Sequence, residues 1–169
     1  MFRSLKRTFA FAIVSVALFA PALAHADGDV HVALTAQRVT VTDGKEVFAP
    51  AEKAKPGDVI EYRAVYKNDG RTAVSNLDAT LPVPGGLEYL PKTAAPAVVL
   101  ASTDGTSFAP VPLLRKERTA DGRTVVREVP LSEYRALRWT VGTLAAQESR
   151  TVRARMRVAP LASVAAVTH

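Results

Sequence analysis

Three arginines near the C-terminal end have a spacing that suits the binding of an anionic partner. Arg153, Arg155 and Arg157 alternate with apolar residues in the segment 151–158, and Arg150 stands just before it. If this segment is a β-strand, alternate side chains share one face and lie about 7 Å apart. The four arginines therefore form a candidate face for an anionic polymer, such as a polysaccharide, or for a surface lipid.

Two other interpretations of this arginine face remain open. A row of like charges is unfavourable unless acidic side chains lie opposite, so a neighbouring strand can supply compensating carboxylates. The candidates for that role are Glu61, Glu128 and Glu133. Alternatively, the charges protect an exposed edge strand from pairing with other chains. Arg135 and Arg138 would join the face if the strands that contain them pair with it as a hairpin.

Residues suited to catalysis are few. Without the leader described below, the sequence contains two histidines, His31 and His169, which cannot form a three-histidine zinc site. Paired carboxylates can hydrolyse glycosidic bonds, but the sequence does not show which acids pair. The acids considered are Glu61, Asp78, Glu88, Glu128 and Glu133. Phosphate-binding loops, calcium loops and the Gly-x-Ser-x-Gly motif do not occur, so we expect no enzyme activity, cofactor or metal site.

The composition narrows the remaining classes of function. The sequence contains no cysteine, which excludes disulfides, thiolate metal sites, redox chemistry, a cysteine nucleophile and the acylated cysteine of a lipoprotein. The formal net charge is +6. Three of the 22 basic residues lie in the leader, so the remaining 19 exceed the 16 acidic residues by three. This surplus is too small to indicate nucleic-acid binding.

Residues 1–26 have the three parts of a secretory signal peptide. A basic start is followed by an apolar stretch at 9–20, and small residues precede the predicted cleavage between Ala26 and Asp27. Cleavage after Ala24 and an uncleaved N-terminal anchor are the alternatives. The apolar stretch is short for a membrane span. We therefore expect a helical leader, export to the periplasm or the cell exterior, and no membrane span after cleavage.

From residue 27 to residue 158 the sequence has the two-residue periodicity of β-strands. Val152, Ala154 and Met156 alternate with the arginines, and Ile60, Tyr62, Ala64 and Tyr66 alternate with polar residues, so these apolar faces should meet in a core. The only tryptophan, Trp139, should anchor that core. At 36–38 the alternation slips, which predicts a bulge or a bend.

Turn sequences separate about eight to ten short strands, and no segment after the leader has the 3.6-residue period of a long helix. The pattern predicts an all-β domain over residues 27–158, folded as an immunoglobulin-like antiparallel β-sandwich. Residues 159–169 have no strong period, and we expect a loosely ordered tail there.

Several segments together resemble a bacterial module. They are Lys55-Pro56-Gly57-Asp58, Ile60-Glu61-Tyr62, Asn68-Asp69-Gly70, Asn76–Pro82, Pro84–Tyr89, Leu137–Leu144 and Arg150–Val158. Their order and spacing are similar to the DUF11 family, also called the conserved repeat domain, and the last two resemble its closing hairpin. The resemblance implies an immunoglobulin-type sandwich in an exported bacterial protein, with a structural or adhesive role and no shared catalytic residues. The chain departs from the family by its single copy and by a long insert at 98–129.

We therefore expect a non-catalytic exported module that binds or scaffolds a cell-envelope or extracellular component. Its partner would be an envelope protein or an anionic surface polymer. The alternative is a subunit or assembly factor of a surface fibre that acts by β-strand addition. An unrecognised hydrolase is a third hypothesis.

Overall fold

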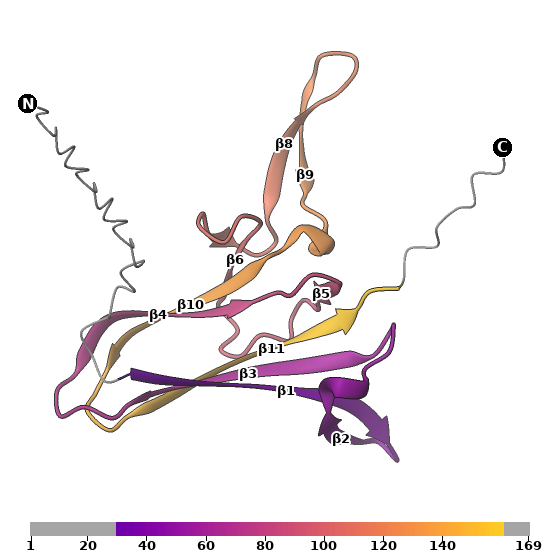
Figure 1. Ribbon diagram of the computed structural model, residues 1–169. Coiled ribbons are helices and arrows are strands. Elements are labelled where there is room, and N and C mark those ends of the chain that lie inside the picture. The colour runs from indigo at the N-terminus through magenta and orange to yellow at the C-terminus, as the bar shows by residue number, and fades with distance from the viewer. Residues whose placement is uncertain (1–29, 161–169) are drawn as a thin grey trace, which may run out of the picture.

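The computed structural model describes residues 30–160, so the predicted leader, its Ala26–Asp27 cleavage site and residues 161–169 lie outside the described part. All the sheets are antiparallel (Figure 1). A five-stranded sheet contains, in spatial order, β2 (Lys45–Pro50), β1 (Val30–Thr42), β3 (Val59–Asn68), β11 (Ser149–Val158) and β5 (Leu87–Tyr89). A four-stranded sheet contains β4 (Val74–Pro82), β10 (Ala136–Leu144), β6 (Leu100–Ser102) and β7 (Ala109–Pro110).

The two sheets enclose one core, which confirms the predicted immunoglobulin-like antiparallel β-sandwich. The five-stranded sheet contributes inward-facing residues from β3 and β11, and the four-stranded sheet contributes them from β4 and β10. These residues include Ala64, Tyr66, Val152, Ala154, Met156, Ala79, Leu81, Leu137 and Trp139. Trp139 is buried as predicted, and its indole N–H donates to the carbonyl of Pro96 at 2.7 Å. Burial of these apolar surfaces is the main source of stability in a chain without disulfides.

Two buried polar side chains stabilise the core through hydrogen bonds to backbone groups. The hydroxyl of Tyr66, on β3, donates to the carbonyl of Thr80 and accepts from its N–H, at 3.0 and 2.9 Å, and so ties the two sheets together. Asn68 is fully buried at the end of β3. Its amide nitrogen lies 2.8–3.1 Å from the carbonyls of Thr72, Leu144 and Ala145, which closes two loops over one end of the sandwich.

The structure corrects two sequence-based expectations about strands. The predicted bulge at 36–38 is wrong, because β1 pairs with β3 in unbroken register from Val30 to Val39. The apolar residues change face within an unbroken strand instead: Val32 and Leu34 share the core-facing side of β1, whereas Val39 and Val41 lie on the opposite side. The sequence also predicts a loop from Gly142 to Gln147, but β10 continues to Leu144, with register shifts around Gly142.

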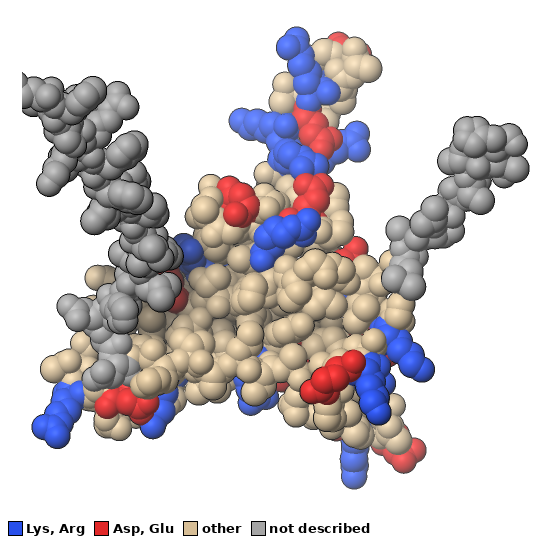
Figure 2. Space-filling model, viewed as in Figure 1, with Lys and Arg blue, Asp and Glu red and all other residues tan. Residues whose placement is uncertain are grey.

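The predicted insert at 98–129 contains two hairpins. The first pairs β6 with β7. The second pairs β8 (Leu114–Arg118) with β9 (Thr124–Glu128) and projects away from the sandwich as an arm (Figure 1). Figure 2 shows charges of both signs on this arm, above a largely uncharged part of the sandwich. The arm is therefore an appendage rather than part of the core.

Candidate functional site

Two of the predicted arginines, Arg153 and Arg155, lie with Arg63 around one buried carboxylate. Arg155 lies opposite Glu61 in the pairing of β11 with β3, and the side chain of Glu61 is only 3% exposed. The Arg155 Nε and the Arg153 Nη1 each donate to the Glu61 Oε2 at 3.1 Å, and Arg63 donates to its Oε1 at 3.2 Å. The outer face of β3 thus carries a buried acid covered by arginine side chains.

A second carboxylate completes this cluster. Both terminal nitrogens of Arg155 donate to the two oxygens of Glu46, on β2, at 2.6 and 2.7 Å. These hydrogen bonds from Arg155 hold the pKa of Glu46 below its usual value. Burial of Glu61 acts to raise its pKa, but hydrogen bonds from Arg63 and Arg155 and the nearby positive charges outweigh it, so that pKa is also lowered. Both acids are therefore ionised at neutral pH.

These contacts decide between some of the interpretations of the arginine face. Compensation by an acid on a neighbouring strand is confirmed for Glu61, whereas Glu133 instead pairs with Arg115 at the base of the arm. Protection of an edge strand is wrong for Arg153, Arg155 and Arg157, because this part of β11 is paired with β3 on one side and with Ala95 and β5 on the other. Binding of an anionic partner stays a prediction. Arg157 forms no ion pair with any of residues 30–160, so its charge is available to an anionic partner.

The other arginines lie apart from this cluster. Arg150 has the strand phase of the core-facing residues of β11 and pairs with Glu148 at 2.6 Å. The predicted hairpin between β10 and β11 does not form, because these strands belong to different sheets. Arg138 accordingly lies on the four-stranded sheet, over the ring of Phe108. Arg135 donates to the backbone carbonyl of Ser132 at 2.7 Å.

The residues considered for catalysis are scattered. His31 is exposed on β1, with its Nε2 3.7 Å from a carboxylate oxygen of Asp69. Asp78 lies near Arg138 on the four-stranded sheet, and Glu88 lies on β5. Within residues 30–160, no group of three or more His, Asp or Glu side chains could hold a metal ion. The described part of the chain also has no helix long and apolar enough to cross a membrane.

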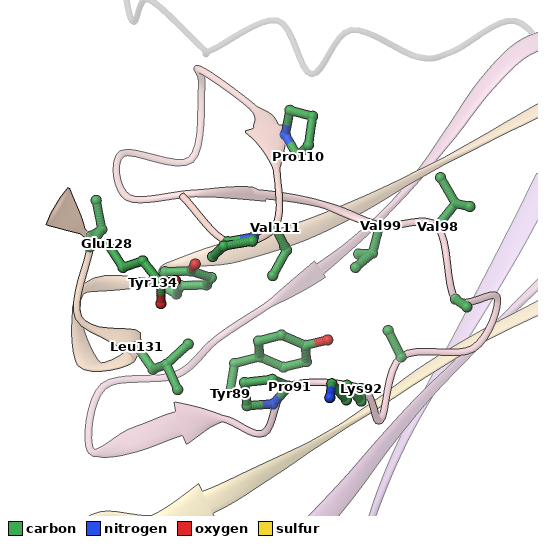
Figure 3. A pocket seen from close by; sticks show the side chains of 14 residues that line it. Tyr89, Pro91, Lys92, Val98, Val99, Pro110, Val111, Glu128, Leu131 and Tyr134 are labelled. Carbon is green, nitrogen blue, oxygen red and sulfur yellow. The ribbon is translucent and has the colours of Figure 1, made fainter. Parts of the chain in front are cut away.

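A cavity lies where both sheets end, at the base of the arm (Figure 3). Its volume is about 640 Å³. Tyr89 and the loop after it form one side, the segment after β7 forms another, and the chain between β9 and β10 closes the third. The apolar lining includes Val98, Val99, Val111, Val129, Leu131 and Tyr134.

Two tyrosines form the buried floor of this cavity. The rings of Tyr89 and Tyr134 stack with their centroids 6.2 Å apart and an angle of 19° between planes. The Tyr134 hydroxyl accepts the N–H of Leu113 at 2.9 Å, which fixes the ring at the base of the arm. Burial raises the pKa of the Tyr89 hydroxyl, so this side chain is neutral at physiological pH. The floor therefore offers aromatic surface without charge.

Charge is confined to the margin of the cavity. Lys92 and Glu128 are the charged residues in its lining, and both are exposed. At the mouth, Val98 is 86% exposed. An apolar cavity with a few polar groups at its edge is typical of a ligand site. The sequence analysis missed this cavity, because its residues come from three separate segments of the chain. The one available signal was the long insert at 98–129, which supplies half of the lining.

No protein-family model, curated protein or solved structure matches the chain. The resemblance to the conserved repeat domain accordingly stays a prediction.

Proposed function

We propose that the protein is a non-catalytic exported module that binds a cell-envelope or extracellular component through the cavity below the arm. The observation that carries this proposal is the apolar cavity at the place where both sheets end. Its volume of about 640 Å³ lies in the range of small-molecule sites, roughly 300–1,000 Å³. Export is inferred from the leader at 1–26.

The chemistry of the lining defines the class of ligand. Valine, leucine, proline and tyrosine side chains favour an apolar or aromatic group, because transfer of such a group out of water is favourable by about 25 cal/mol per Å². Lys92 and Glu128 at the margin suit one polar or charged end that remains in water. The ligand we expect is therefore an amphipathic molecule of the envelope, with its apolar end on the tyrosine floor.

The arrangement of side chains supports binding rather than catalysis. General acid–base chemistry needs a titratable group within hydrogen-bond reach of the reacting atom. Of the cavity residues, Lys92 and Glu128 carry charge, and they are contributed by opposite margins of the cavity. The Tyr134 hydroxyl already accepts a backbone N–H. The cavity is therefore better suited to binding a ligand than to acid–base catalysis.

A fluorescent probe tests the binding site. The chain is expressed with its leader, purified from the exported fraction and titrated with anilinonaphthalene sulfonate, whose emission rises in an apolar site. We expect saturable binding at one site, weakened at least about tenfold by Val111→Glu, because a carboxylate is introduced into the apolar wall. Val126→Glu on the arm, which adds the same charge at a 59% exposed position, should leave the affinity unchanged.

The natural ligand is sought with the same pair of variants. Native mass spectrometry of the protein after incubation with envelope extract should show a small-molecule adduct that Val111→Glu removes and Val126→Glu retains. Should Val111→Glu fail to fold, judged by circular dichroism, Leu131→Asn replaces it. Equal adducts on all variants, or no saturable probe binding, would contradict the proposal.

A further inference from the structure

Half of β1 is an open sheet edge. β3 pairs with β1 along Val30–Val39 on one side, but β2 covers only Gln37–Thr42 on the other. Within residues 30–160, no strand pairs with the outer side of Val30–Ala36. We call these seven residues the β1 edge. They present unpaired backbone groups that can hydrogen-bond an added strand.

The β1 edge lacks the usual protection against strand addition. Natural edge strands are commonly blocked by lysine, proline, inward-pointing charges or bulges. The sequence Val-His-Val-Ala-Leu-Thr-Ala contains no lysine, arginine, acid or proline, and its register with β3 is unbroken. Val32 and Leu34 also expose about half of their surface on the core-facing side. The β1 edge is thus an apolar site as well as an open one.

We propose that the β1 edge pairs with the β1 edge of a second copy of this chain, antiparallel, about a two-fold axis at Ala33. In this register Val32 lies opposite Leu34 of the second copy, and Leu34 lies opposite its Val32. Two apolar pairs therefore form on the core-facing side, where each chain alone exposes them. Because residues 30–36 carry no acid, lysine or arginine, the same surface meets itself without repulsion between like charges.

The fold limits the length of this pairing. At Gln37 the outer side of β1 is already occupied by Pro50 of β2. A hollow lined by Thr35, Ala36, Gln37, Pro50 and Glu52 marks this end of the open edge. An added strand of about seven residues therefore fits, and a longer one meets β2. Two such edges join two five-stranded sheets into one sheet of ten strands.

The two-fold register has a consequence for assembly. Each copy uses the same edge, so the pairing closes at two chains and does not extend into a fibre. The cavity lies at the other end of the strand order, beside β5, and is separate from this edge. The proposal is therefore independent of the proposed function.

Charge substitutions test the register. Sedimentation of the purified exported protein over a range of concentrations should show a monomer–dimer equilibrium. The double variant Val32→Lys/Leu34→Lys places lysines opposite each other and should be monomeric. The variant Val32→Lys/Leu34→Glu places opposite charges across the axis and should dimerise again. Val126→Lys, at a similarly exposed valine on the arm, should dimerise like the unaltered protein.

A cysteine adds a direct measurement, because the chain has none of its own. Across the axis the two Ala33 residues would have Cα atoms about 4.5–5.5 Å apart, within the range that a disulfide bridges. Ala33→Cys should form a covalent dimer under mild oxidation at concentrations where Val126→Cys does not. A protein that stays monomeric, a mass that grows beyond two chains, or failure of the lysine–glutamate variant to dimerise would overturn the proposal.

Discussion

At the scale of single residues, Glu61 holds arginine side chains against the outer face of the five-stranded sheet. Its carboxylate is buried, and Arg63, Arg153 and Arg155 satisfy it. Removal of one partner of such a buried cluster leaves the others without compensation. Glu61 is therefore expected to matter more for stability than any exposed acid.

We predict that Glu61→Gln lowers the free energy of unfolding by about 1–3 kcal/mol at neutral pH, because a neutral amide replaces a buried charged acceptor. Urea denaturation followed by circular dichroism measures the change. Arg157→Gln, at an exposed position on the neighbouring strand β11, serves as control and should change stability by less than about 0.5 kcal/mol. Equal effects of the two substitutions would contradict a structural role for Glu61.

The same cluster predicts a dependence on pH. The folded-state pKa values of Glu46 and Glu61 lie below the ordinary value of 4.5, so their ionised forms stabilise the fold above that pH. This stabilisation should be lost as the pH falls from about 4.5 through the lowered pKa values. Urea midpoints measured between neutral and acidic pH should fall less steeply for Glu61→Gln than for the unaltered protein. Parallel pH profiles would show that the cluster does not contribute.

Asn68 gives a third prediction at this scale. We expect Asn68→Ala to destabilise the fold by about 2–3 kcal/mol, because it removes the donor to carbonyls from two loops at a fully buried position. Asn68→Asp should be at least as unfavourable, since it places a carboxylate against the same carbonyl oxygens. Both are measured by thermal unfolding. An Asn68→Asp variant as stable as the unaltered protein would refute this account of the residue.

At this scale, the sequence pattern predicts which residues face the core but does not predict the buried carboxylate. Two-residue alternation correctly predicts that Trp139, Tyr66 and Met156 face the core, because each strand shows its own apolar face. It assigns Glu61 to the outer face but not to a buried position. That burial depends on which strands are neighbours and on their register, and neither is encoded in the alternation of one strand.

At the scale of elements, the arm formed by β8 and β9 contributes little to the core. None of the residues 114–128 is buried, whereas Leu113 and Val129 at its base are. We predict that replacing residues 116–126 with a two-residue Asn-Gly turn leaves the fold cooperative and shifts the melting temperature by only a few degrees. Circular dichroism on heating measures this; loss of a cooperative transition would mean that the arm is part of the folding unit.

Turn chemistry explains why most strands are predictable. Asp43 and Gly44 both have positive φ values, of 52° and 73°, and join β1 to β2 as a tight hairpin. Pairing between distant strands is harder to predict from the sequence. β10 and β11 follow each other and resemble a hairpin, yet β10 pairs with β4 and β11 with β3. Each strand completes a different sheet, and the sequence between them carries no signal of that crossing.

At the scale of the whole molecule, two features of the described sandwich are open to a ligand or a partner. One is the cavity where the sheets end beside β5 and β7, and the other is the β1 edge. The cavity collects residues from β5, from the loops that flank β6 and β7, and from the chain after β9. A site built from so many segments follows from the overall packing, which is why the sequence predicts the sandwich and not the cavity.

The most direct test of the central claim is a nuclear magnetic resonance titration of the isotope-labelled protein with anilinonaphthalene sulfonate. The claim is that the cavity, rather than the arginine cluster, is the ligand site. Saturable shifts should be confined to the amides around Val99, Val111 and Leu131. Shifts centred on Arg153 and Arg157, or no saturable shifts at all, would contradict it.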